Sequence, residues 1–296
     1  MTPETRALLQ QIGADLDAHR QVRVRIGGIV SHEAAPALME EVEISNEQQR
    51  QTGPAAGSRQ RTSGRQGAAR RPRPSRPASQ LRGHALRAAY QAQLDELEAA
   101  YPGTQKFPDD DGMWLLVRSS VLPGLNKEAA FLVAVPFAEG AFPRAWGFWQ
   151  TAEGPQWIGR RHTNFPDGSV CAFVPESGVW RVGDSLASLL DFYSVWALRQ
   201  LYLEEFKRWP GRQYSSHPFY RLIEFKDDEL CDCDTGGRYG SCCKPNDLAQ
   251  DLIALKAGFE AKMGCRITDR VPPLAVVAFM SGTAPLPKVR DLLGLA

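Results

Sequence analysis

Four of the six cysteines of this chain lie within thirteen residues, and this cluster limits what its part of the chain can fold into. It consists of a Cys-x-Cys pair (Cys231 and Cys233), an eight-residue gap and two adjacent cysteines (Cys242 and Cys243). Zn²⁺ takes four thiolate or imidazole ligands at tetrahedral corners, so the spacing predicts one structural Zn²⁺ site. A disulfide between adjacent cysteines would be strained, and a reducing cytoplasm also favours metal over disulfides.

The sequence between the two cysteine pairs is typical of a tight return of the chain. Three glycines, Gly236, Gly237 and Gly240, supply the backbone freedom that such a short loop needs. The stretch CDCDTGGRYGSCCK resembles the SEC-C zinc motif, apart from Asp234, where that motif usually has glycine. The resemblance implies a small zinc-knuckle module over residues 225–250 that docks other proteins. Two alternatives stay open: the thiols lie together by chance, or the Zn²⁺ only stabilises a fold with little core.

The charge and composition of the 296-residue chain are those of an ordinary soluble globular protein. Hydrophobic residues make up 43% and charged residues 23%, and the net charge of +1 creates no field that attracts nucleic acid or membranes. The longest apolar runs are too short to span a bilayer, and the first residues show no secretory signal. We therefore expect a cytoplasmic protein whose folded parts bind neither membranes nor nucleic acid.

Residues 46–80 differ in kind from the rest of the chain. They contain no Leu, Ile, Val or aromatic residue, and eight arginines but no acidic residue lie from Arg50 to Arg76. Such a segment cannot bury enough apolar surface to offset its ordering entropy, so we expect a disordered, Arg-rich linker. A basic arm that scans an acidic partner or nucleic acid is the alternative, but the arginines lack interleaved aromatic residues for base stacking.

The patterns on either side of this linker predict an α+β fold. Before it, a helix over residues 3–19, a strand over 22–26 and a helix over 34–42 form an expected accessory α/β segment, residues 1–45. After it, helical spacing predicts one amphipathic helix over 84–101. Three extended runs follow, and their short connections indicate an antiparallel β-meander flanked by helices. The runs are 113–121, 129–137 and 145–150.

The remaining elements follow the meander. Asp184 is expected to cap a long helix that ends before Trp209. In and near the C-terminal extension, residues 251–296, we expect a helix over 248–263, a buried strand over 274–280 and a short helix over 289–295. Cys265 has no nearby ligand set, and we expect it to be an inert core thiol.

A loop between the meander and the long helix carries the isolated Cys171. The turn sequence Pro-Asp-Gly at 166–168 precedes a short extended segment, on which Cys171 follows His162 by nine residues. A thiol at the end of a turn, beside imidazole and amide side chains, is a candidate exposed nucleophile. The alternative is a half-buried small apolar residue on a strand. We expect Arg160 and Arg161 to form a solvated lip or to guide an acidic partner.

This loop resembles the active-site region of ubiquitin-conjugating enzymes. In that family a His-Pro-Asn element precedes the catalytic cysteine and a tryptophan follows it. The matching residues here are His162, Thr163, Asn164, Cys171 and Trp180. Thr163 departs from the family's proline, and the spacing from His162 to Cys171 is slightly shorter than in eukaryotic members.

The resemblance covers residues 81–215 and, through Trp196 and the Trp-Pro-Gly at 209–211, is closer to bacterial members of anti-phage conjugation systems. It implies a UBC-like catalytic domain in which Cys171 takes a ubiquitin-like modifier as a thioester from a ubiquitin-activating-like enzyme. The modifier then passes to an amine of a protein target. Asn164 would stabilise the oxyanion or hold the loop, and His162 would have a structural role. The alternative is a catalytically inactive UBC-like adaptor that binds proteins through its zinc knuckle.

Overall fold

The computed structural model describes most of the chain outside residues 33–82. The described residues are 1–18, 21–25, 28–32, 83–119, 128–173, 178–211, 213, 215–233 and 235–295, with the backbone alone given for 21–25 and 28–32. The predicted helix over 34–42 and the Arg-rich segment 46–80 lie outside these residues.

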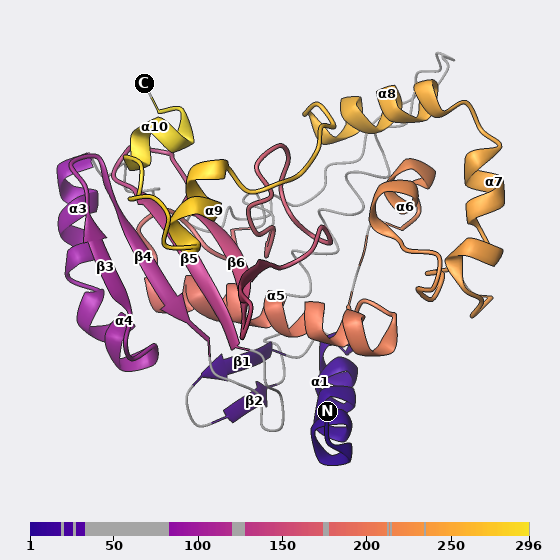
Figure 1. Cartoon of the computed structure of the whole chain (residues 1–296), viewed down its shortest axis with the longest axis horizontal. Coiled ribbons are helices and arrows are strands. Elements are labelled where there is room, and N and C mark those ends of the chain that lie inside the picture. The colour runs from indigo at the N-terminus through magenta and orange to yellow at the C-terminus, as the bar shows by residue number, and fades with distance from the viewer. Residues whose placement is uncertain are drawn as a thin grey trace, which may run out of the picture.

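A five-stranded antiparallel sheet forms the centre of the fold (Figure 1). Its strands are neighbours both along the chain and across the sheet, so the predicted meander is confirmed. Two edge strands of four residues each extend the sheet beyond the three predicted runs. They were not predicted, because runs this short show no clear alternating pattern in the sequence. The strands are β3 (Gln105–Pro108), β4 (Gly112–Arg118), β5 (Glu128–Pro136), β6 (Arg144–Thr151) and β7 (Gly154–Trp157).

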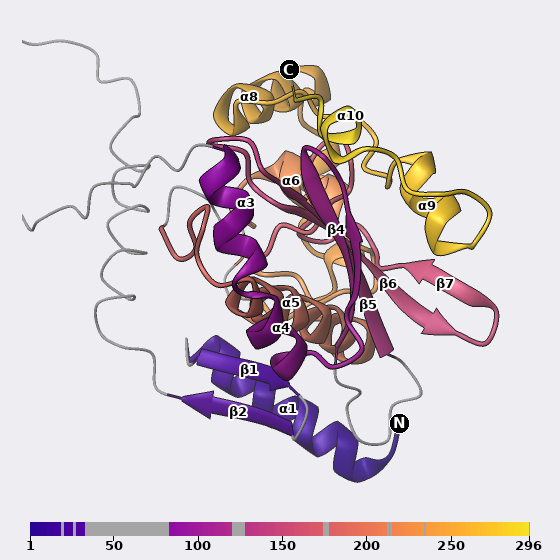
Figure 2. The same ribbon diagram turned by 90° about the vertical axis from the view of Figure 1, so that its left-hand side faces the viewer.

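Three helices cover one face of the sheet: α3 (Gly83–Gln91), α4 (Leu94–Ala100) and the long α5 (Leu186–Phe206) (Figure 2). Successive strand residues point to opposite faces, so Leu115 and Phe131 pack in the same core as Leu190 of α5. This core contains most of the buried apolar residues of the described chain.

The start of α5 explains why the predicted helix over 84–101 is two helices. The side chain of Gln93, between α3 and α4, accepts the N–H of Leu186 (2.8 Å) and donates to the carbonyl of Gly183 (3.2 Å). Ser185, rather than the predicted Asp184, caps α5 by accepting the N–H of Ser188 (3.3 Å).

The C-terminal helices α9 (Leu274–Met280) and α10 (Val289–Leu293) cover the other face of the sheet (Figure 2). Val276 and Val289 pack there against Trp114 and Trp146. The predicted buried strand over 274–280 is therefore wrong. A seven-residue apolar run fits a strand or a helix equally well, and here Leu274 is 87% exposed at the helix start.

The N-terminal elements pack near the end of α5. Helix α1 (Pro3–Asp17) starts at the capping residue Thr2 and places Leu9 and Ile12 in the main core. Asp17 accepts hydrogen bonds from Arg208 (2.5 Å) and from the N–H of Gly211 (2.7 Å). An antiparallel pair, β1 (Gln21–Arg25) and β2 (Gly28–His32), forms a separate two-stranded sheet.

Three short elements and one longer helix lie between α5 and α9. They are α6 (Pro218–Glu224), the 3₁₀ turn η2 (Tyr239–Ser241), α7 (Lys244–Leu248) and α8 (Leu252–Met263). The helix predicted over 248–263 begins at Leu252, where Asp251 accepts the N–H groups of Ile253 (3.0 Å) and Ala254 (3.1 Å). None of the described helices is long and apolar enough to cross a membrane.

Candidate functional site

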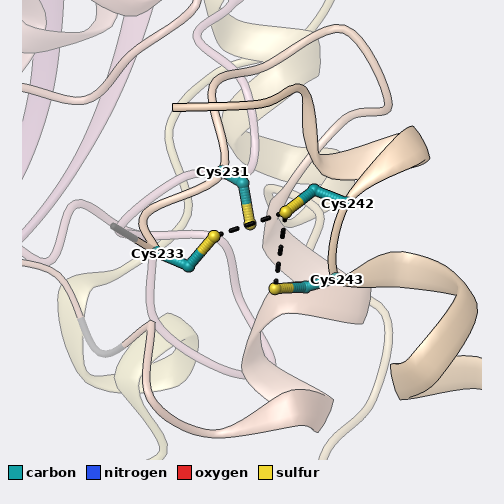
Figure 3. Close-up of side chains that lie close together, drawn as sticks. All are labelled: Cys231, Cys233, Cys242 and Cys243. Atoms are coloured by element: carbon teal, nitrogen blue, oxygen red, sulfur yellow. Dashed lines mark hydrogen bonds between the residues drawn. The ribbon is translucent and has the colours of Figure 1, made fainter. Parts of the chain in front are cut away.

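The structure brings the four clustered cysteines together around one point (Figure 3). Their Sγ atoms all lie within 4.8 Å of one another, with 3.3 Å from Cys233 to Cys242 and 3.9 Å from Cys242 to Cys243. None of the four is in a disulfide. Zn–S bonds of about 2.3 Å at tetrahedral corners place sulfurs about 3.8 Å apart, so this donor set fits a zinc ion.

The close contacts in the cluster shift the pKa values of its thiols in both directions. Hydrogen bonds with Thr235 lower the pKa of Cys233 to about 6, whereas its hydrogen bond to Cys231 and its burial raise the pKa of Cys243 to about 12. Neighbouring thiolates repel one another, and a dication held among them favours the ionised form of all four.

The backbone around the cysteines forms a small hairpin with little core of its own. Leu230 and Arg238 form an antiparallel bridge, and the N–H of Cys231 donates to the carbonyl of Gly237 (2.8 Å). Its buried apolar cluster contains only Phe225, Cys231 and Tyr239 among the described residues. A metal ion would therefore supply much of what holds this segment together.

A polar network fixes the hairpin to its neighbouring helices. Asp247 of α7 accepts hydrogen bonds from Arg221 of α6 (2.8 Å) and from the hydroxyl of Tyr239 (3.0 Å). The predicted module over residues 225–250 thus contacts α6, which precedes it.

The second candidate site is the loop from residue 160 to 173, called here the Cys171 loop. An isolated antiparallel bridge joins Thr163 to Val170, and the N–H of Cys171 donates to the carbonyl of His162 (3.0 Å). The N–H of Val170 donates to Ala145 of β6 (2.7 Å), which ties the loop to the sheet. The sequence-predicted residues Cys171, His162 and Asn164 therefore share one loop at the edge of the meander.

Asn164 is exposed, and its side-chain amide is engaged within the loop. The Nδ2 atom lies 3.2 Å from the Ser169 hydroxyl and 3.2 Å from the carbonyl of Val170, and donates to both. Backbone hydrogen bonds between Asn164 and Ser169 (2.7 Å) and between Gly168 and Asn164 (2.9 Å) close the turn. In this conformation Asn164 holds the loop, one of the two roles expected for it.

The thiol of Cys171 is half-buried and weakly acidic. Burial raises its pKa to about 11, the Glu224 carboxylate adds to this effect, and the Arg270 guanidinium opposes it. At pH 7 a thiol of this pKa is ionised in about one molecule in 10⁴. The thiol is thus half-buried, as the alternative expects, and not the exposed nucleophile that the turn sequence indicates.

His162 has a structural environment. Its backbone is left-handed (φ +51°) and its ring stacks on Trp209 with centroids 4.4 Å apart. Burial and the nearby Arg161, Arg199 and Arg270 charges lower its pKa to about 3, so the ring is neutral near pH 7. A base this weak does not deprotonate a thiol of pKa about 11.

The turn that precedes Cys171 leaves little room for a side chain at Gly168. Its φ of +64° is in the left-handed region, and an added Cβ would lie 3.1 Å from the backbone carbon of Val271. We expect Gly168→Ala to lower the free energy of unfolding by about 1–2 kcal/mol, measured by urea denaturation. Gly140→Ala is the matched control, because its φ is +73° but its Cβ would meet no atom within 4 Å. Equal losses in the two variants would show that the close contacts of the added Cβ, with Trp157 and Val271 among others, contribute nothing.

Two further sequence-based expectations are wrong in detail. Arg160 is exposed, as a solvated lip requires, but Arg161 is buried, because it forms ion pairs with Glu229 and Glu224 from a later part of the chain. Cys265 is exposed rather than in a core, since it directly follows Gly264, where α8 ends.

Trp180 lies outside the Cys171 loop and has a packing role. It is fully buried in the main core, and its indole N–H donates to the carbonyl of Ser185 at the start of α5 (2.9 Å).

No protein-family model, curated protein or solved structure matches this chain. Its function is therefore inferred from the geometry of the two candidate sites and from the residues they contain.

Proposed function

We propose that this chain is a conjugating enzyme that carries a ubiquitin-like modifier as a thioester on Cys171. The observation that supports this most directly is the bridge between Thr163 and Val170, because it brings the His162–Asn164 element beside Cys171 in one loop. An α+β fold with an antiparallel meander before the loop and a long helix after it is also what the proposal needs.

The reaction consists of two acyl transfers. The Cys171 thiolate attacks the thioester carbonyl on an activating enzyme, a new S–C bond forms, and the enzyme's thiolate leaves. An amine of the target then attacks this thioester, Cys171 leaves as a thiolate, and the nitrogen loses a proton to solvent. A thiol with a raised pKa is a poorer leaving group, so the environment of Cys171 slows both hydrolysis of the loaded form and transfer to the amine.

Asn164 and His162 serve this chemistry through the loop backbone. Asn164 keeps the turn closed, and its amide becomes a donor for the oxyanion only if its bonds to Ser169 and Val170 open. The carbonyl of His162 accepts the N–H of Cys171 (3.0 Å) and the indole N–H of Trp196 (2.9 Å), which orients the thiol-bearing residue.

The thioester itself is the test. The chain is incubated with ATP, a candidate activating enzyme and its ubiquitin-like modifier, and the products are run on a non-reducing gel. We expect a conjugate band that thiol reagents remove. It disappears in Cys171→Ala and persists in Cys265→Ala, the matched control in which an exposed cysteine is lost.

Two results would contradict the proposal. One is a band that survives in Cys171→Ala. The other is no band from wild type when the activating enzyme forms its own thioester with the modifier. The second result would favour the adaptor, for which the exposed apolar surface of α8 is the supporting feature: Ile253 is 84% exposed, beside the four-cysteine segment.

The four-cysteine segment, residues 225–250, is proposed to bind one structural Zn²⁺ through Cys231, Cys233, Cys242 and Cys243. The ion would close the hairpin and hold its thiolates together.

A further inference from the structure

Four charged side chains from four separate segments meet in the interior beside the Cys171 loop. Arg161 belongs to the loop, Glu224 ends α6, Glu229 precedes the cysteine hairpin, and Arg270 follows α8; each side chain is only 2–4% exposed. Arg161 pairs with Glu229 and lies 3.8 Å from Glu224, which in turn lies 2.5 Å from Arg270. This set is called the buried ion network below.

The buried ion network ends on the backbone of the Cys171 loop. The carbonyls of three successive residues each accept a hydrogen bond from a side chain of a distant segment: that of Arg161 from Gln200 (2.6 Å), that of His162 from Trp196 (2.9 Å) and that of Thr163 from Arg270 (3.2 Å). Since the carbonyl of His162 also accepts the N–H of Cys171, these contacts hold the backbone of Cys171 in place.

Flat aromatic rings fix the two arginines of the network. The guanidinium of Arg161 lies 4.2 Å from the centre of the Phe225 ring, and that of Arg270 lies 4.4 Å from the centre of the Phe165 ring. Phe225 belongs to the small apolar cluster of the cysteine hairpin. Arg161 therefore contacts that hairpin through both a charge and a ring.

The position of Glu229 depends on the hairpin that the four cysteines form. Its carbonyl accepts the N–H of Tyr239 across the hairpin (2.9 Å), and Cys231 follows two residues later. The hairpin has little apolar core, so a metal ion would help to hold Glu229 against Arg161, together with the N–H of Leu230, which donates to the carbonyl of Lys207 (2.7 Å). Removing Glu229 would leave Arg161 as a buried charge with a weaker partner, and such groups move toward water.

We propose that Arg161 and Arg270 are positioning residues for Cys171, and that metal binding at the four cysteines holds the Cys171 loop in place through Glu229. The cysteine hairpin then controls the reactivity of the Cys171 thiol, which is not one of the four proposed metal ligands. With the network intact, Cys171 stays half-buried; with the metal removed, Arg161 loses its contact with Glu229, keeps Gln213 and the more distant Glu224 as partners, and holds the loop less firmly, so that the loop opens.

The rate at which iodoacetamide alkylates Cys171 measures this link directly. The assay needs no conjugation partner, so a negative result is distinguishable from a failure of thioester formation. Alkylation of the peptides that contain Cys171 and Cys265 is followed by mass spectrometry from pH 7 to 11, in the full chain before and after chelation of zinc. Cys265, already exposed, is the internal reference. The groups that face Cys171 are Glu224 and Tyr220 of α6 and Arg270.

We expect chelation to speed alkylation of Cys171 at pH 7 by about tenfold and to lower the midpoint of its pH profile by about two units. A midpoint lowered by two pH units raises the thiolate fraction at pH 7 about a hundredfold. The less basic thiolate is also a weaker nucleophile, which reduces the net gain in rate to about tenfold. Cys265 changes little, and adding zinc back restores slow alkylation of Cys171. Glu229→Gln has the same effect without chelation, whereas Asp228→Asn, which removes a carboxylate from an exposed ion pair with Lys207, has none.

Unchanged alkylation of Cys171 in both the zinc-free protein and Glu229→Gln would overturn the proposal. Hydrogen exchange of the β5 amides, recorded on the same samples, separates a local opening from general unfolding. Loss of β5 protection would also overturn it, because Cys171 would then respond to unfolding of the whole fold rather than to the buried ion network.

Discussion

Chelation of the metal, or Cys242→Ser, is expected to unfold residues 225–250 and to abolish metal binding. The four sulfurs lie within 4.8 Å of one another, and the described residues of the segment include only three buried apolar ones. Structural zinc contributes about 10–16 kcal/mol of apparent binding free energy in small zinc-finger peptides, more than such a core can replace. This is the largest stability effect that we expect for any single substitution in the chain.

Elemental analysis of the purified protein should find about one zinc per chain, because the four thiolates form one tetrahedral set. Hydrogen exchange should show that amides 225–250 are protected in the zinc-bound protein and exchange rapidly in Cys242→Ser. Cys265→Ser is the matched control and should keep both the metal and the protection, since Cys265 lies outside the cluster. A metal-free protein with a protected hairpin would contradict the assignment.

The second large effect is the loss of stability on acidification that His162 causes. The pKa of its ring is lowered to about 3 in the folded state, against 6.5 for an ordinary histidine. Between these values the unfolded chain binds a proton that the folded chain does not, so the free energy of unfolding decreases as the pH falls. One such group contributes about 1.4 kcal/mol per pH unit, which is about 2 kcal/mol between pH 6.5 and pH 5.

The measurement compares wild type with His162→Asn by urea denaturation at several pH values. Asn tolerates the left-handed backbone at this position, but it does not titrate. The stability difference between the two proteins should be constant above pH 7, which serves as the internal control, and should shrink as the pH falls below 6.5. A constant difference down to pH 4 would mean that His162 is protonated in the folded protein, and thus that its ring reaches solvent.

The meander was predictable from the sequence because its three long strands are continuous apolar runs separated by turn residues. Cys231, Cys233, Cys242 and Cys243 were predictable as one cluster because all four belong to one short hairpin. Local patterns of this kind can be recognised without knowledge of contacts between distant parts of the chain. The run at 274–280 shows the limit, since its apolar character fits either a strand or a helix, and only the sheet face that it covers decides between them.

The buried ion network could not be predicted, because its partners are far apart in the sequence. Arg161 meets Glu229 across 68 residues, and Arg270 reaches the carbonyl of Thr163 across 107. From the sequence alone, each of these residues is indistinguishable from an ordinary charged residue at the surface. Only their common burial identifies them, and burial of a charge is a property of the fold rather than of any local pattern.

The position of Arg270 has a consequence for how the nascent chain matures on the ribosome. Arg270 follows Cys171 by 99 residues, and translation at about 5–20 residues per second takes about 5–20 s to cover that interval. During this time Thr163 lacks its guanidinium donor, and the tryptophan-lined side of the sheet awaits α9 and α10. The thiol therefore reaches its enclosed setting only late in synthesis, after the sheet and α5 have already emerged.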